Sequence, residues 1–141
     1  MDKDITGMLR ENGFKVTPQR LAVYEALLAT KEHPNAETLF TMLQPKYPTM
    51  SLATVYKTIE VLAKMGIVKV INTGEDYFRY DADISDHAHI KCTLCNKVKD
   101  IYASNTLKLI SDVEKNTGYN INSQQIYFFG MCPECQKKSA N

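Results

Sequence analysis

The chain has 141 residues, 44% of them hydrophobic, which is enough to bury a core in one domain or in two small ones. A net charge of +1 excludes a protein that holds nucleic acid through an overall positive field, so a nucleic-acid reader would need a local patch. The start, Met1-Asp2-Lys3-Asp4, lacks the basic end and apolar core of a signal peptide, and no apolar run reaches membrane-spanning length. We therefore expect a cytoplasmic protein that does not enter a membrane.

Two helices are predicted near the start of the chain. A helical face of Ile5, Met8 and Leu9 precedes Gly13, which is placed to end that helix. Thr17-Pro18 combines a hydroxyl N-cap with proline at the first helical position. The second helix then carries an apolar stripe that we expect to be buried, formed by Leu21, Tyr24, Leu27 and Leu28.

Two more helices follow. Pro34-Asn35 opens one that the segment from Pro45 to Pro48 closes, and Ser51 caps another that stops at Gly66. Their predicted buried residues are Leu39, Met42 and Leu43 in the third helix, and Val55, Ile59 and Leu62 in the fourth.

A hairpin completes the first half. The short β-rich runs Ile67–Ile71 and Tyr77–Tyr80 flank a turn at Asn72–Asp76. Helices followed by a hairpin are the order of a winged helix-turn-helix, so we predict such a domain at residues 1–81, followed by a linker at 82–85.

The second half, residues 86–141, is predicted to be a small α/β unit. Ala88–Cys92 and Lys97–Tyr102 are predicted strands, and Ser104 can cap a helix that ends at Gly118. Tyr119–Phe129 is apolar and aromatic enough for a further strand. The predicted fold class of the whole chain is therefore α+β.

The four cysteines form two pairs, Cys92-x-x-Cys95 and Cys132-x-x-Cys135, with 36 residues between them. A CxxC turn presents two sulfurs at the span of a tetrahedral edge, so two turns complete a four-thiolate zinc site. Four thiolates leave no open position, so this zinc would be structural. Two disulfides or one redox-active pair are the alternatives, and a reducing cytoplasm favours zinc.

His87-x-His89 holds two of the chain's three histidines. On an extended segment both imidazoles project to one side, because strand side chains alternate. A site that also used His33 would join the two domains, and nitrogen and oxygen ligands favour Fe(II) or Mn(II) over tetrahedral zinc. The alternative is solvated surface histidines beside a solvated acidic linker. The nearby acidic residues are Asp81, Asp83, Asp86 and Asp100.

Several short motifs follow one another along the chain: Gly13–Arg20, His33-Pro34, Ser51–Tyr56, Asp86–His89 and the two CxxC pairs. Through them the chain resembles the Fur family of metal-dependent bacterial repressors over nearly its whole length. Several separate motifs in the right order make chance a poor explanation. Within the family the chain is most similar to the peroxide-sensing repressors.

The resemblance implies a homodimeric repressor of double-stranded operator DNA with two metal sites. Structural zinc is implied on the four cysteines, and regulatory Fe(II) or Mn(II) on His33, Asp81, His87, His89 and Asp100. Hydrogen peroxide acting on the iron form is implied to oxidise His33 and His87 to 2-oxo-histidine, which releases the metal and then the DNA. Manganese is far less reactive towards peroxide, so the manganese form should repress but sense poorly.

The N-terminal part of the fourth helix is the expected DNA reader, because recognition helices contact bases and phosphates there. Ser51 can cap the helix while its end meets phosphate. Base or methyl contacts are expected from Thr54 and Tyr56 and a phosphate contact from Lys57, although Tyr56 could instead pack against the wing. The resemblance adds Lys15 and Arg20 as flanking contacts. The apolar strand Ile126–Phe129 of the second domain is the expected dimer interface, although it could equally be plain core.

Three other functions compete with peroxide sensing. Iron-sensing family members commonly have glutamate where Asp100 stands, and an extra histidine where this chain has Ser123-Gln124-Gln125. A non-haem iron enzyme also uses histidines with a carboxylate, but it needs a substrate pocket. In a thiol oxidoreductase, alanine at Cys95 would abolish activity without unfolding the protein. We predict a regulator and not an enzyme.

Overall fold

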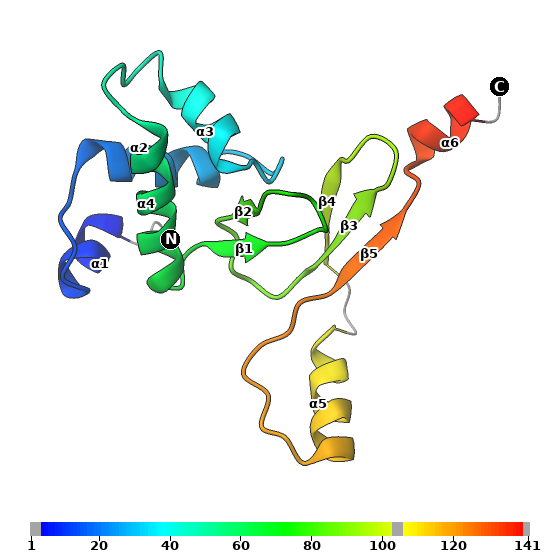
Figure 1. The fold of residues 1–141 in the computed structure, drawn as a ribbon. Coiled ribbons are helices and arrows are strands. Elements are labelled where there is room, and N and C mark those ends of the chain that lie inside the picture. Colours follow the sequence, from blue (N-terminus) through cyan, green and yellow to red (C-terminus); the bar gives the residue numbers. More distant parts are fainter. Residues whose placement is uncertain (1–3, 103–105, 140–141) are drawn as a thin grey trace. The chain divides into compact units, whose positions relative to one another are not determined.

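The computed structural model describes residues 4–102 and 106–139. The chain divides into two compact units, Met1–Ile84 and Ser85–Asn141, and the division falls inside the predicted linker. Figure 1 labels the helices and strands of both units. Within the described residues, no helix combines the length and the apolar character needed to cross a lipid bilayer.

The first unit is a winged helix-turn-helix, as predicted. Its helices pack around one core, and its two strands pair antiparallel with Lys69 opposite Asp81 and Ile71 opposite Arg79. The elements are α1 (Ile5–Glu11), α2 (Pro18–Leu28), α3 (Ala36–Leu43), α4 (Leu52–Lys64), β1 (Lys69–Ile71) and β2 (Arg79–Asp81).

Local side-chain chemistry sets where the helices begin. The Thr17 hydroxyl accepts a hydrogen bond from the backbone N–H of Arg20, and Pro18 occupies the first helical position of α2. Asn35 caps α3 through the N–H of Thr38, and Ser51 caps α4 through the N–H of Thr54. These caps confirm the three predicted helix starts, because each satisfies an N–H that has no partner within the helix.

The end of α4 is set by Gly66. Its φ of +75° lies in the left-handed region, which glycine enters without steric cost. The N–H groups of Gly66 and Ile67 return to the carbonyls of Ala63 and Leu62, which is the Schellman pattern. The chain then turns directly into the segment that leads to β1.

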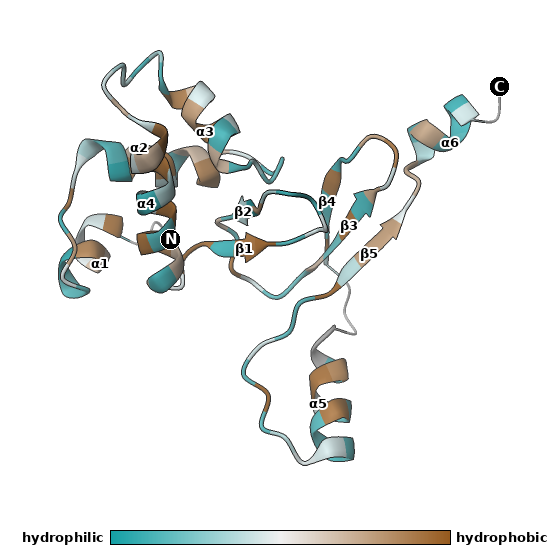
Figure 2. Ribbon diagram, viewed as in Figure 1, coloured by the Kyte–Doolittle hydropathy of each residue, from teal (hydrophilic) through white to brown (hydrophobic). Residues whose placement is uncertain are grey.

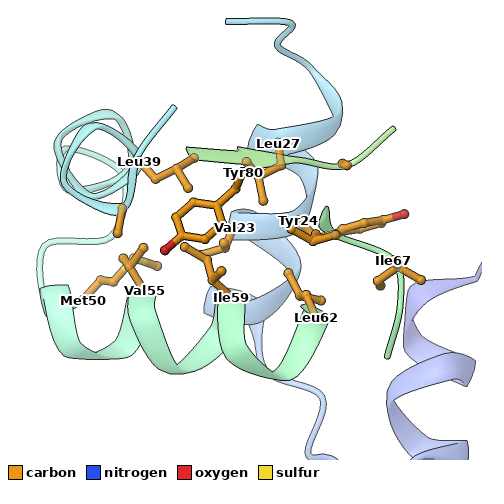
Figure 3. Close-up of a cluster of buried hydrophobic side chains, with 13 residues drawn as sticks. Val23, Tyr24, Leu27, Leu39, Met50, Val55, Ile59, Leu62, Ile67 and Tyr80 are labelled. Carbon is orange, nitrogen blue, oxygen red and sulfur yellow. The ribbon is translucent and has the colours of Figure 1, made fainter. Parts of the chain in front are cut away.

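One hydrophobic cluster holds α2, α3, α4 and β2 together (Figure 3). Two expectations were wrong: Leu28 is 55% exposed and Met42 is 52% exposed. The buried face of α2 follows Val23, Tyr24 and Leu27, and Leu28 lies about 100° around the helix from Leu27. Met42 lies in the last turn of the short helix α3, whose buried positions are Ala36 and Leu39.

The hairpin connection is longer than predicted. β2 begins at Arg79, so Tyr77 and Phe78 belong to the loop, where their side chains are 42% and 50% exposed. The loop folds on itself through Glu75, whose carboxylate accepts hydrogen bonds from the hydroxyl groups of Thr73 and Tyr77. Side-chain hydrogen bonds within the loop therefore replace the strand ladder that the aromatic residues had suggested.

The second unit contains a three-stranded sheet in the order β4-β3-β5. β3 pairs antiparallel with β4, placing His89 opposite Asp100, and parallel with β5, placing Cys92 opposite Gly130. The elements are β3 (Ala88–Cys92), β4 (Val98–Ile101), α5 (Thr106–Thr117), β5 (Tyr127–Gly130) and α6 (Pro133–Ser139).

Parts of this unit differ from expectation. The strand predicted over Tyr119–Phe129 is confined to β5, because its partner β3 offers only the span from His89 to Cys92. Helix α6 was not predicted. The α5 helix is confirmed, and its predicted cap, Ser104, lies outside the described residues.

The second unit buries few apolar side chains. Among its described residues the buried hydrophobic positions are Ala88, Cys92 and Val98. Figure 2 shows that α5 and β5 carry hydrophobic residues. Two of these residues, Leu109 and Phe128, are about half exposed. A unit with so little core needs another source of stability.

Candidate metal centres and DNA-contact helix

The two CxxC pairs meet at the end of the β3–β5 pairing. Cys92 ends β3, Cys95 lies in the following turn, and Cys132 and Cys135 lie just before and within α6. The N–H of Thr93 donates to the carbonyl of Gly130 at 2.7 Å, which brings the two turns together. As a result, the four sulfur atoms lie within 4.8 Å of one another.

The spacing of the sulfurs fits a tetrahedral metal ion. Cys95 Sγ and Cys132 Sγ are 3.9 Å apart, whereas a disulfide bond is about 2.05 Å long. Zn–S bonds of about 2.3 Å place the corners of a regular tetrahedron about 3.8 Å apart. All four cysteines are free thiols in the structure. The group has the dimensions of a closed, four-coordinate zinc site.

Backbone amides point at the same sulfurs. The N–H groups of Cys95 and Cys132 donate to Cys92 Sγ at 3.5 and 3.4 Å, and they lower the pKa of that thiol to about 6. Neighbouring thiols, Cys132 first, raise the pKa of Cys135 to about 12. One thiolate therefore forms readily, whereas a full set requires a cation to offset the crowded negative charge.

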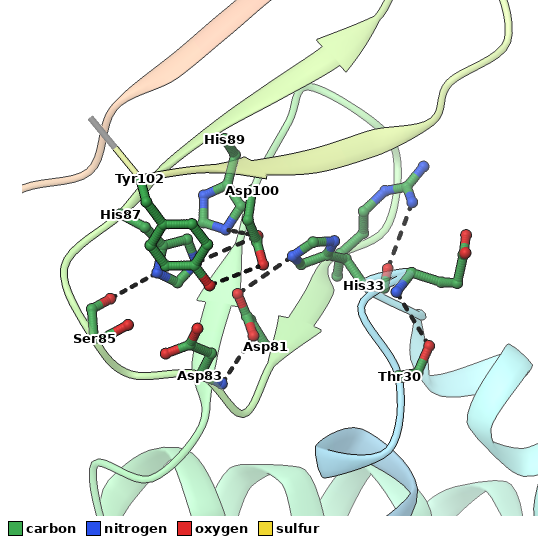
Figure 4. A network of polar contacts seen from close by, with 11 residues as sticks. Thr30, His33, Asp81, Asp83, Ser85, His87, His89, Asp100 and Tyr102 are labelled. Carbon is green, nitrogen blue, oxygen red and sulfur yellow. Dashed lines mark hydrogen bonds and ion pairs between the residues drawn. The ribbon is translucent and has the colours of Figure 1, made fainter.

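A histidine–carboxylate pair lies in the first unit. His33 Nε2 is 3.3 Å from Asp81 Oδ2, and both side chains are buried (Figure 4). The other carboxylate oxygen of Asp81 accepts the N–H of Asp83 at 2.9 Å, which fixes the orientation of the carboxylate. The strand β2 positions Asp81, and the loop between α2 and α3 positions His33.

The backbone of His33 is in an unusual conformation, with φ at +54°. A non-glycine residue in the left-handed region costs about 1 kcal/mol or more, and such residues cluster at functional sites. The strain is offset by contacts of the surrounding chain, among them the hydrogen bond from Tyr80 N–H to the carbonyl of Pro34 at 3.1 Å.

A second group lies in the second unit. His87 Nε2 and His89 Nε2 are each 3.3 Å from Oδ1 of Asp100 (Figure 4). Antiparallel pairing of β3 with β4 positions Asp100 opposite His89. His87 Nδ1 lies 2.7 Å from the carbonyl of Ser85. Since a carbonyl only accepts, Nδ1 is the donor of this hydrogen bond, which fixes the orientation of the ring and directs Nε2 toward Asp100.

The predicted regulatory residues thus form one group within each unit, His33 with Asp81 and His87 and His89 with Asp100. Imidazole and carboxylate donors without thiolate are the ligand types of a metal site that differs in kind from the four-cysteine group. The exposed carboxylate of Asp86 has no part in either group.

The residues expected to contact DNA lie on the surface of the first unit. Tyr56 and Lys57 are exposed on α4, and Lys15 is exposed before α2. Arg20 donates from Nη1 to the carbonyl of Lys15 at 2.8 Å, which holds the two basic residues together. The Thr54 and Ser51 hydroxyl oxygens are 2.9 Å apart, so in this structure Thr54 shares a hydrogen bond at the helix cap.

Tyr56 is partly exposed to solvent and partly packed beside the residues of the hairpin. Its side chain is 47% exposed, and it also lines a hollow of about 530 Å³ that Phe78 and Tyr80 border. Burial raises the pKa of the Tyr80 phenol above its usual value, and the nearby Tyr56 adds to that shift. Aromatic side chains therefore gather between α4 and the β1–β2 hairpin. The sequence analysis did not predict this, because it placed Phe78 in a strand.

A winged helix-turn-helix unit followed by a small α/β unit with metal-binding groups defines a metal-responsive transcriptional regulator. The model of the Ferric uptake regulator family matches residues 11–129, and the chain belongs to this family.

Its relatives include peroxide regulators. The transcriptional regulator PerR of Clostridium acetobutylicum is 46% identical over 96% of this chain and 99% of its own. The peroxide operon regulator of Bacillus subtilis is 34% identical, covering 96% of this chain and 94% of its own.

Solved structures with the same fold include both kinds of regulator. The Campylobacter jejuni peroxide stress regulator has a TM-score of 0.78 at 32% identity, over 94% of this chain and all of that one. The Helicobacter pylori ferric uptake regulator Fur, which has three functional metal-binding sites, has a TM-score of 0.81 at 25% identity, over 94% and 89% of the two chains.

Proposed function

We propose that the chain is a metal-dependent transcriptional repressor that senses hydrogen peroxide and then releases its operator DNA. The proposal rests most on one observation: His87 and His89 both direct Nε2 at the same oxygen of Asp100, so a group of nitrogen and oxygen donors exists apart from the four thiols. The names of the relatives from Clostridium acetobutylicum and Bacillus subtilis support it independently.

The regulatory metal, Fe(II) or Mn(II), binds to residues of both units in this proposal. Its ligands are His33, Asp81, His87, His89 and Asp100, the two groups described above. A metal that needs donors from two units favours the arrangement in which both reach it, so occupancy biases a conformational equilibrium without touching DNA.

Zinc on the four cysteines is the structural metal. The sulfur spacing, the amide hydrogen bonds to Cys92 and the sparse core of the second unit all support this assignment. Four thiolates leave no place for a substrate or for peroxide, so this site stabilises the fold and does not sense.

Bound Fe(II) would supply the one reaction that the side chains lack, the reduction of hydrogen peroxide to an oxidant beside the ligands. One peroxide oxygen would end on the ring carbon between the two nitrogens of His33 or of His87. The hydrogen of that carbon would move to a ring nitrogen, and the other peroxide oxygen would leave as water. A 2-oxo-imidazole is a poor metal ligand, so the donor set is lost and repression ends. Both side chains are buried, which keeps the oxidant close to them.

DNA binding by a homodimer completes the proposal. Operator contacts come from Lys15, Arg20, Ser51, Thr54, Tyr56 and Lys57. The near-zero net charge gives modest non-specific affinity, so two half-sites read together are needed for specificity. Ile90 and Phe128 are paired in the β3–β5 register, and their exposure supports a second copy as the partner of that surface.

An iron-sensing repressor is the second candidate, because the Fur structure from Helicobacter pylori has the same fold. Such a repressor would respond to the concentration of iron and not to peroxide. The aspartate at position 100 and the Ser123-Gln124-Gln125 segment favour peroxide sensing.

Peptide mass spectrometry after peroxide treatment tests the proposal. Trypsin releases Tyr80–Lys91, which contains His87 and His89 but no methionine or cysteine. We expect this peptide to gain one oxygen in the Fe(II) form and not in the Mn(II) form. The His33 peptide also contains the exposed Met42, so fragmentation must locate its added oxygen. An unmodified Tyr80–Lys91 in both forms, with DNA binding still metal-dependent, would favour the iron sensor.

A further inference from the structure

Three consecutive residues of β2 contact the loop that carries His33. Arg79 Nη1 lies 3.5 Å from the carbonyl oxygen of His33, and Tyr80 N–H donates to the carbonyl of Pro34 at 3.1 Å. Asp81 Oδ2 lies 3.3 Å from His33 Nε2. The backbone and the ring of His33 are therefore both held by the same short strand.

The guanidinium that reaches His33 is itself fixed by Glu75. Arg79 Nε donates to Glu75 Oε1 at 2.7 Å and Nη2 donates to Oε2 at 3.0 Å, a bidentate pair. The two side chains are 12% and 9% exposed, so water screens the pair weakly. A bidentate carboxylate leaves the third nitrogen of the guanidinium, Nη1, directed away from Glu75 and toward His33.

The wing is the β1–β2 hairpin, and its loop, residues 72–78, closes around the same carboxylate. Thr73 Oγ1 donates to Glu75 Oε1 at 2.6 Å, and the Tyr77 hydroxyl donates to Oε2. The Arg79 guanidinium also lies 5.9 Å from the centre of the Tyr77 ring. Residues of the wing are thus linked through Glu75 and Arg79 to a backbone that is held at a φ of +54°.

We propose that Arg79, oriented by Glu75, is a positioning residue that holds the His33 backbone in its left-handed conformation and so aims the imidazole at Asp81. The pair binds no metal itself. It sets how well His33 is prepared to act as a ligand, and in that respect it rests on the proposed regulatory site. The order of the wing and the affinity for the metal are then coupled equilibria. Contacts that order the wing would strengthen metal binding, and metal binding would in turn order the wing.

The competing explanation is that the pair only stabilises the wing loop. A charge swap, Glu75→Arg with Arg79→Glu, separates the two roles. It keeps an ion pair in the loop but places a carboxylate, which cannot donate, toward the carbonyl of His33. Arg79→Lys removes the bidentate geometry and keeps the charge. The matched control is Glu60→Gln, because Glu60 and Lys64 form an exposed pair with the same sequence spacing.

Nuclear magnetic resonance of the histidine rings gives a readout that does not require the regulatory metal. The chain has three histidines, so ¹⁵N-labelled zinc-loaded protein shows three ring systems, and His33→Asn identifies that of His33. We expect Arg79→Lys and the charge swap to shift the His33 signals and to leave those of His87 and His89 in place. Glu60→Gln should change none of them.

Mn(II) affinity, measured by competition with a chelating dye, completes the test. We expect Arg79→Lys and the charge swap each to weaken Mn(II) binding about 10-fold, as loss of an outer partner of a metal ligand does. The inference is overturned if the folded charge swap has wild-type His33 signals and wild-type Mn(II) affinity. A wild-type protein that binds no Mn(II) would overturn the proposed regulatory site instead, while the ring signals would still decide the role of Arg79.

Discussion

The imidazole of His33 and the carboxylate of Asp81 lie 3.3 Å apart, and each is almost fully buried within the first unit. Burying a carboxylate is costly unless it is paired, and here the Asp83 N–H and the His33 ring supply partners. The two side chains therefore hold their relative positions without a metal. This reduces the conformational entropy cost that metal binding at the proposed site has to offset.

Replacing His33 by asparagine should strongly weaken regulatory metal binding and leave the zinc in place. The change removes a nitrogen donor from a preformed pair, so we expect Mn(II) affinity to fall by about 100-fold or more, beyond the usual effect of an outer partner. Metal content after dialysis against Mn(II) measures this. Asp86→Asn, an exposed neighbour of His87, is the control and should retain Mn(II). Undiminished manganese in His33→Asn would contradict the ligand assignment.

Replacing Cys95 by serine should release zinc and destabilise the second unit. Because Ala88, Cys92 and Val98 are the buried apolar residues among its described positions, we expect this unit to depend on the proposed zinc more than on a core. We expect the zinc content to fall below one equivalent and the midpoint of thermal unfolding to drop by about 10 °C or more. A stable, zinc-loaded Cys95→Ser protein would argue against a structural role and reopen thiol redox chemistry.

Features set by local chemistry could be predicted from the sequence. The hydroxyl of Thr17, the hydroxyl of Ser51 and the left-handed Gly66 each act within a few residues, so their patterns define helix ends. The meeting of the two CxxC pairs was also foreseeable, since metal-ligand spacing is a local signal even when the pairs are far apart in sequence.

Features set by partners elsewhere in the fold could not be predicted. Aromatic residues at Tyr77 and Phe78 indicated a strand, but Glu75 binds Arg79 and Tyr77 and keeps that segment in a loop. The length of β5 depends on β3, which no periodicity within Tyr119–Phe129 records. The left-handed backbone of His33 could not be predicted from the neighbouring sequence either, because the residues that contact it lie in β2.

The Glu75–Arg79 pair should contribute to the free energy of unfolding at neutral pH, and this contribution should be lost at acid pH. Hydrogen bonding to Arg79 lowers the pKa of Glu75 from 4.5 to about 2, so its stabilising contribution is present above pH 4.5 and is lost as the pH falls toward 2. We expect the difference in unfolding midpoint between wild type and Glu75→Gln to be constant near neutrality and to shrink below pH 4.5. Measurements with a chelator present keep metal release out of the comparison.

The same series in Glu60→Gln provides the reference. Glu60 and Lys64 are more than two-thirds exposed, so solvent screening leaves their ion pair little energy to lose. A difference between wild type and Glu75→Gln that persisted unchanged to pH 3 would show that the charge of Glu75 contributes nothing to it and that the glutamine destabilises the loop in another way.

Lys57 should contribute to operator binding through phosphate and Lys64 should not. Both lie on α4, but Lys57 is exposed near the N-terminal part that recognition helices insert into DNA, while Lys64 ends the helix beside Glu60. Removing one phosphate contact lowers the slope of log K against log salt by about 0.9 per site. We therefore expect Lys57→Ala to weaken operator binding and flatten its salt dependence, measured by fluorescence anisotropy with Mn(II) present. Lys64→Ala should match the wild type; equal losses from both variants would mean that α4 meets DNA along its whole length and not by its first turns.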